Sequence, residues 1–98
     1  MPFAIMTYDK PDSQTLRAAL RPAHLAYLMA HQHMLLAGGA LLDQEGEHSI
    51  GSLLIVDTTH RQAAESLIGG DPFTLGGLFA SVHIVPWRKA FFDRSHTG

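Results

Sequence analysis

The sequence contains no cysteine. This excludes a disulfide-stapled scaffold and a metal site built from thiolates, and it is typical of a reducing compartment. Charged residues are also few, at 16% of the chain, and the 7 Lys and Arg against 9 Asp and Glu include no basic run. Because proteins that bind the phosphate backbone of nucleic acids carry such runs, we expect no nucleic-acid partner.

Long apolar segments are absent as well. The apolar runs are far shorter than the roughly 20 residues that cross a bilayer, and no charged segment followed by an apolar stretch opens the chain. We therefore expect a cytoplasmic protein with no membrane partner. The motifs G-x-G-x-x-G, G-x-x-x-x-G-K-[ST] and G-x-S-x-G do not occur. Nothing therefore indicates nucleotide or serine hydrolase chemistry, and no cofactor is expected.

What is present is enough for one domain with a modest core, since the chain has 98 residues. Apolar runs and alternation predict strands, and helical spacing with capping residues predicts helices. The expected strands are 3–8, 35–42, 50–56 and 78–87, and the expected helices run from about 12 to 34 and from 58 to 70, with a helical turn after Asp71. This order predicts an α+β, ferredoxin-like βαββαβ domain with an antiparallel sheet. We assign residues 1–89 to this domain and 90–98 to a C-terminal tail.

Three local expectations follow from individual residues. Pro22 lies inside the first helical pattern and predicts a kink or restart there. Gly69 and Gly70 predict a helix end at a left-handed residue. Residues 50–56 are almost continuously apolar, which predicts a central strand. Because both helices cover one face of such a sheet, the apolar residues of the other face predict a homodimer packed through that face.

Histidine is the unusual component, with seven residues. His48, His60 and His96 fall in a loop, a helix start and the tail, where a surface position is expected. His31 and His33 point in different directions on a helix, and neither has a carboxylate at ligand spacing, so we expect no metal site. That leaves His24 and His83.

His24 follows the irregularity at Pro22 and is expected to face inward or toward a cavity edge. It could be a half-buried structural histidine or a proton-transfer group. Asp71 before Pro72 is a standard helix cap, but a capping carboxylate can also orient an imidazole. If the two meet, His24 and Asp71 would form a base and its orienting partner.

Two further residues could bind a substrate. Arg21 could hold an anionic group, or it could be an exposed cation beside the predicted kink. His83 could line the same cavity or the dimer interface, or it could be a core residue. A rival base is the amine of Pro2, used by tautomerases of similar size, but the chain begins at Met1 and an acylated proline nitrogen has no basic lone pair.

The motifs also resemble a known family, the YCII-related (YciI-like) proteins of the dimeric α+β barrel group. The resemblance covers residues 3 to about 89 and rests chiefly on Arg-Pro-Ala-His-Leu at 21–25 and Asp-Pro-Phe at 71–73, supported by Gly51-Ser52 and by Gly-Leu-Phe at 77–79. It implies a homodimer with a site built from His24 and Asp71, and relatives include a dehydrochlorinase of a chlorinated hydroxyquinol.

Three interpretations of function remain at this point. The first is a dimeric enzyme of lyase or isomerase type that moves a proton on a small molecule, with His24 as acid or base, Asp71 as its orienting partner and Arg21 as an anion contact. The second is a non-catalytic ligand-binding or structural dimer. The third, a haem- or oxygen-using protein of the same barrel group, requires a large apolar cavity with one histidine pointing into it.

Overall fold

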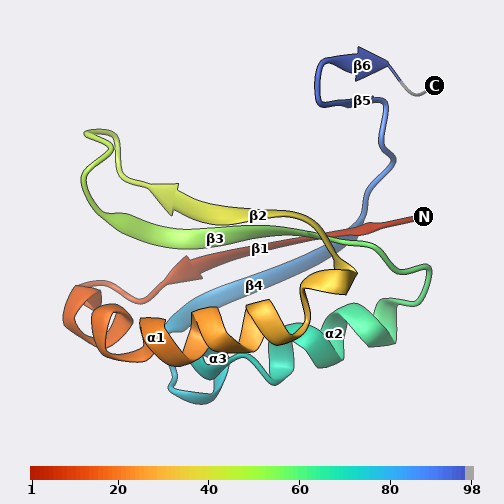
Figure 1. Ribbon diagram of the computed structural model, residues 1–98. Helices are drawn as coiled ribbons and strands as arrows, with labels where there is room; N and C mark the ends of the chain where they lie inside the picture. Colours follow the sequence, from red (N-terminus) through yellow and green to blue (C-terminus); the bar gives the residue numbers. More distant parts are fainter. Residues whose placement is uncertain (97–98) are drawn as a thin grey trace.

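The computed structural model describes residues 1–96. Four strands form one antiparallel sheet in the order β2-β3-β1-β4, and the helices cover one of its faces (Figure 1). The elements in chain order are β1 (Phe3–Asp9), α1 (Gln14–Ala30), a 3-10 turn (Gln32–Met34), β2 (Leu35–Leu42), β3 (Ser49–Val56), α2 (Arg61–Gly69), α3 (Pro72–Leu75), β4 (Phe79–Pro86), β5 (Phe91–Phe92) and β6 (Ser95–His96). The predicted α+β ferredoxin-like fold is confirmed.

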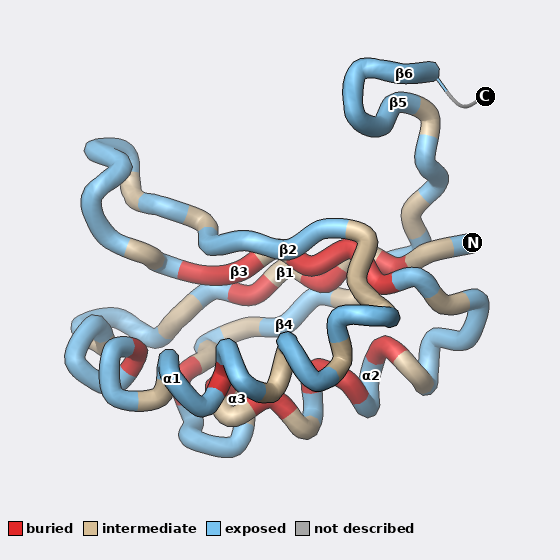
Figure 2. The backbone as a smooth tube through the Cα atoms, viewed as in Figure 1, coloured by how far each residue is buried: buried red, intermediate tan, exposed pale blue. Residues whose placement is uncertain are grey.

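The core lies between the sheet and α2. Alternate residues of β1 point toward the helices and are buried, and the central strand β3 is buried over most of its length, as expected (Figure 2). The face of α2 predicted from its sequence packs against these strands. The central cluster consists of Phe3, Ile5, Leu54, Val56, Ala64, Leu67 and Ile68.

Helix α1 differs from the prediction in two respects. It is one continuous helix through Pro22, so the expected restart there is wrong. The residues Ala18 and Pro22 are both exposed, and the carbonyl of Ala18 that proline cannot bond is therefore open to water. The helix also ends at Ala30, before the expected end at about residue 34, and a 3-10 turn follows at Gln32–Met34. Its buried residues are Arg17 and His24.

The ends of α2 also differ from the prediction. Its N-cap is His60, later than the expected start at residue 58, and the hydroxyl of Thr58 accepts a hydrogen bond from the His60 backbone N–H. Gly70 ends the helix with a right-handed φ of −89°, so no left-handed residue is used there. A left-handed glycine comes later, at Gly77, with φ +76°, where the chain turns into β4.

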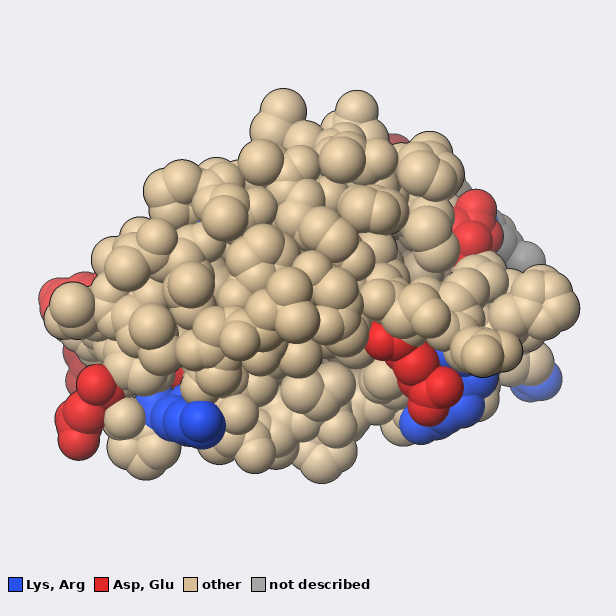
Figure 3. All heavy atoms as spheres, turned by 90° about the horizontal axis from the view of Figure 1, so that it is seen from below, with Lys and Arg blue, Asp and Glu red and all other residues tan. Residues whose placement is uncertain are grey.

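The face of the sheet opposite the helices is open in the single chain, and we call it the open face. Met6 and Leu53 lie on it beside the exposed residues Tyr8 and Val85, since they alternate with helix-facing residues of the same strands. Seen from the helix side, most of the surface is uncharged and the charged groups lie near its margins (Figure 3). No helix in residues 1–96 is long and apolar enough to cross a membrane.

Candidate functional site

A His–Asp pair joins α1 to the start of α3. Asp71 is the N-cap of α3, and its side chain accepts a hydrogen bond of 2.9 Å from the backbone N–H of Phe73. The same carboxylate lies 2.8 and 2.9 Å through its two oxygens from Nδ1 of His24. A carboxylate only accepts hydrogen bonds, so the proton between the two groups belongs to Nδ1 of His24. In the neutral form of the imidazole the other ring nitrogen, Nε2, then carries the lone pair.

The imidazole of His24 is held from a second direction by an aromatic ring. It stacks on Phe73 with ring centroids 3.8 Å apart and planes at 12°. Phe73 is fully buried and is fixed in turn by the edge of Phe79. Because it is bonded to Asp71 and stacked on a buried ring, the imidazole is held in a single orientation.

A cavity of about 210 Å³ lies in front of this histidine, between α1, α3 and strands β2 and β3. His24 lines it, whereas Asp71 sits behind the imidazole with its side chain only 1% exposed. The wall of β2 is free of bulky side chains. The residues that line the cavity are Arg17, Arg21, His24, Leu25, Leu28, Gly38, Gly39, Ala40, Ser49, Ser52, Leu54 and Phe73.

A buried arginine forms part of the same wall. Arg17 donates a 2.7 Å hydrogen bond to Asp9, and its second terminal nitrogen donates to the Gly51 carbonyl and the Ser52 hydroxyl. Its guanidinium carbon also lies 4.7 Å from the centre of the Phe73 ring. The guanidinium is thus held in place on several sides and lines the cavity as the cationic half of an ion pair with Asp9.

Sequence reasoning selected Arg21 and missed Arg17. Arg21 does line the cavity, but it is exposed, so it belongs to the rim. The signal for Arg17 was its spacing, since it lies seven positions before His24, and residues two helical turns apart share a helix face. This spacing alone does not indicate a buried arginine, because long charged side chains are rarely buried unless they are paired.

The structure places the other predicted site residue elsewhere. His83 of β4 pairs with Met6 of β1 and is exposed, so it lies on the open face and not in the cavity. The cavity and the core are therefore wrong for His83, and a place in the dimer interface stays a prediction. In residues 1–96 no cluster of three or more histidine, aspartate or glutamate side chains could hold a metal ion.

Tyr27 lies close to the pair without entering the cavity. Its hydroxyl donates a 2.7 Å hydrogen bond to the carbonyl of Leu67. Burial raises the pKa of the Tyr27 phenol above its usual value, and the negative charge of Asp71 raises it further. The phenol therefore stays protonated and serves to join α1 to α2.

These features define a small α+β protein with a histidine–aspartate pair at a cavity between helix and sheet. The sequence profile of the YCII-related domain matches residues 1–88, and the chain belongs to that family. It is 31% identical to the Protein YciI of Escherichia coli O6:H1 over 93% of this chain and all of that one. It is 32% identical, with the same coverage, to an uncharacterized protein of Haemophilus influenzae.

Solved structures extend the comparison. The 5-chloro-2-hydroxyhydroquinone dehydrochlorinase TftG of Burkholderia phenoliruptrix AC1100, in complex with 2,5-dihydroxybenzoquinone, superposes with a TM-score of 0.82 and is 33% identical. The match covers 90% of this chain and 94% of TftG. The Mycobacterium tuberculosis protein Rv0793 has a TM-score of 0.54 at 20% identity over 93% of this chain and all of that one, and it shares the fold alone.

Proposed function

We propose that the protein is an acid–base enzyme of lyase or isomerase type that acts on a small, oxygen-rich ring compound. The observation that carries the proposal is the position of His24, whose Nδ1 bonds Asp71 while the ring borders the cavity. The free lone pair on Nε2 would accept a proton from a hydroxyl, or from a carbon next to a carbonyl, of a molecule in the cavity. Asp71 would stabilise the imidazolium that forms.

Two cations would recognise the substrate. Arg21 would supply a positive charge at the rim, and Arg17 lines the cavity as the cation of its ion pair with Asp9, so an ionised hydroxyl or a carbonyl oxygen would be held near His24. The similarity to TftG supports a ring with several oxygen substituents, because that relative removes hydrogen chloride from such a ring and binds a dihydroxybenzoquinone. In this protein the proton would pass to Nε2, and a leaving group or a second protonation would complete the reaction.

We further propose that the protein works as a homodimer packed through the open face. The support is the apolar surface formed by Met6, Tyr8, Leu53 and Val85, which would remain wet in a monomer. Two copies that pack these faces against each other form a closed, two-fold symmetric unit. His83 would then lie in the interface.

The enzyme proposal is tested with 5-chloro-2-hydroxyhydroquinone and 2,5-dihydroxybenzoquinone as probes. Chloride release from the first compound would be measured for the native protein and for His24→Gln. Binding of the second compound to both proteins would be measured by titration calorimetry. We expect the substitution to lower turnover by about 10²–10⁴-fold while binding persists. The matched control is His60→Gln, which changes an exposed histidine outside the cavity. A His24→Gln protein with native turnover would exclude His24 as the base.

A second candidate is a ligand-binding dimer without catalysis. It is favoured by the structural role of the His–Asp pair, which ties α1 to the cap of α3. In that case the native protein would bind 2,5-dihydroxybenzoquinone and yet turn over none of a panel of hydroxylated and chlorinated ring compounds. Replacement of His24 would then change the stability of the fold, and there would be no turnover for it to lower.

A further inference from the structure

The C-terminal arm, residues 88–96, has no role in the site described above. It follows β4, where the backbone N–H of Trp87 donates a 2.8 Å hydrogen bond to the Pro2 carbonyl, and it rises on the open-face side of the sheet (Figure 1). Strands β5 and β6 pair with each other. The turn between them is formed by Asp93 and Arg94, both left-handed, which is the geometry of a two-residue hairpin loop.

This hairpin cannot be stable by itself. It has two residues in each strand, and two-stranded ribbons are marginal in water even when they are longer. Its aromatic side chains are largely exposed, with Phe91 at 72% and Phe92 at 40% of full exposure. The ring contact of Phe91 is with His96, and Lys89 lies over the Phe92 ring, so both contacts stay within the arm. Two adjacent exposed phenylalanines on a projecting hairpin indicate a surface that is covered by another chain.

The charge of the arm indicates which part of another chain would cover it. Arg88, Lys89 and Arg94 are three of the seven lysine and arginine residues of the protein, and Asp93 is the one carboxylate in residues 88–96. The loop between β2 and β3 has the opposite character, with Asp43, Glu45 and Glu47 making up three of the nine acidic residues. Within residues 1–96, Glu45 and Glu47 have no ion-pair partner.

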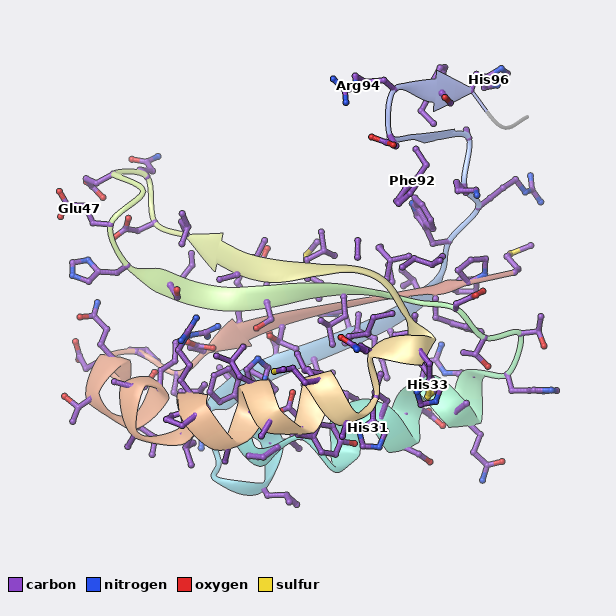
Figure 4. All side chains as sticks on the ribbon, viewed as in Figure 1. His31, His33, Glu47, Phe92, Arg94 and His96 are labelled. Carbon is purple, nitrogen blue, oxygen red and sulfur yellow. The ribbon has the colours of Figure 1, made fainter. Side chains whose placement is uncertain are left out.

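The arm cannot reach this loop in its own chain. The arm leaves the sheet where Pro86 pairs with Phe3, whereas the loop connects Leu42 and Ser49 at the other end of the strands. An eight-residue strand such as β3 separates the two ends by about 26 Å. Figure 4 shows the two segments at opposite ends of the molecule, with Glu47 labelled on the loop and Phe92, Arg94 and His96 on the arm.

We infer that the arm of each chain packs against the partner's β2–β3 loop in a dimer of this protein. When two sheets meet through their open faces and a two-fold axis exchanges their ends, each basic arm lies beside an acidic loop of the other copy. Phe91 and Phe92 then lose their exposure at the margin of the sheet interface. The inference rests on the proposed homodimer and adds to it the pairing of two named segments.

The absence of cysteine from the native chain provides a direct test. The variant with both Arg94→Cys and Glu45→Cys, oxidised at low protein concentration, is expected to form a covalent dimer on a non-reducing gel. Each single substitution places its two thiols far apart in the dimer and is expected to remain uncrosslinked. A disulfide within one chain, or no disulfide in the double variant of a dimeric protein, would overturn the inference.

Sedimentation measurements separate this inference from the dimer itself. We expect the native protein to be dimeric, and Phe91→Ser with Phe92→Ser to weaken the dimer by about tenfold or more. Met29→Ser, which changes an exposed residue of α1 at 67% exposure, is the matched control and should leave association unchanged. A native monomer would remove both proposals, whereas a dimer with unchanged affinity in the arm variant would remove the arm alone.

Charge exchange gives a second measurement that does not depend on the aromatic residues. Arg94→Glu and Glu45→Lys should each weaken the dimer, and the two together should restore part of the loss, because opposite charges again face each other. The recovery should diminish at high ionic strength. Additive losses in the double variant would contradict the predicted contact.

Discussion

The guanidinium of Arg17 lies over the ring of Phe73, with 4.7 Å from its central carbon to the ring centre. The imidazole of His24 stacks on the same ring. One fully buried phenylalanine therefore supports both the fixed cation and the histidine of the cavity. Because Phe73 follows the cap residue Asp71 by two positions, α3 places the orienting carboxylate and the supporting ring in a single turn.

The role of Asp71 can be separated from its role as a helix cap. Asn caps helices about as well as Asp, so Asp71→Asn should preserve the start of α3. It should nevertheless lower turnover by about 10²–10⁴-fold, because a neutral amide neither fixes the tautomer of His24 nor stabilises its charged form. Turnover would be measured as chloride release, and the tautomer by ¹⁵N NMR of the imidazole.

Asp71→Ala serves as the comparison for this variant. It removes the cap as well and should cost an additional 0.5–2 kcal/mol, roughly, in unfolding free energy. An Asp71→Asn protein with native imidazole shifts and native turnover would show that the carboxylate does not orient the histidine.

Because Arg17 and Asp9 form a buried ion pair, loss of either side chain alone should lower the free energy of unfolding strongly. Their side chains are 10% and 6% exposed, so Arg17→Met should leave the carboxylate of Asp9 buried without a partner. We expect a loss of about 3–5 kcal/mol in the free energy of unfolding. Arg17→Met combined with Asp9→Leu should recover most of the loss, as measured by urea denaturation. A double variant as unstable as the single one would contradict this account.

The raised pKa of Tyr27 predicts a loss of stability at alkaline pH. The folded state holds the phenolic proton more tightly than the unfolded state, whose pKa is near 10, mainly because of burial and secondarily because of the charge of Asp71. The contribution is therefore complete below pH 10 and is lost as the pH rises through the folded-state pKa.

Tyr27→Phe provides the measurement for this prediction. It should flatten the decline of unfolding free energy between pH 9 and 11, roughly the range of tyrosine titration, and cost about 1 kcal/mol at neutral pH through the hydrogen bond lost to Leu67. Equal alkaline slopes for the two proteins would assign the effect to other groups.

An added methyl group should lower the stability of the fold at one glycine near the cavity and leave it nearly unchanged at another. A Cβ on Gly51 would overlap the backbone carbonyl oxygen of Thr7, and neither strand can move without breaking the β1–β3 ladder. Gly51→Ala should therefore destabilise the fold by about 1–3 kcal/mol or more. A Cβ on Gly39 meets nothing within 4 Å, so Gly39→Ala should leave the thermal midpoint near the native value.

The fold was predictable because its signals are local. The apolar run of β3, the turn residues and the Asp-Pro cap of α3 each specify an element without reference to the rest of the chain, and their order specifies the ferredoxin-like arrangement. Pro22 was misjudged for the same reason. A proline signals a helix break locally, but here Ala18 and Pro22 lie on the exposed side of α1 and the helix continues through the proline.

The amino-acid sequence by itself determined the order of elements, the family and the two candidate partners His24 and Asp71. Tertiary structure alone decided that these partners meet, that Arg17 is buried beside them while Arg21 stays at the rim, and that His83 faces away. The physical reason is that the segments packed against a helix decide which of its side chains are buried. The carboxylate of Asp9, the carbonyl of Gly51 and the ring of Phe73 come from three distant segments, and only their convergence makes a buried arginine favourable.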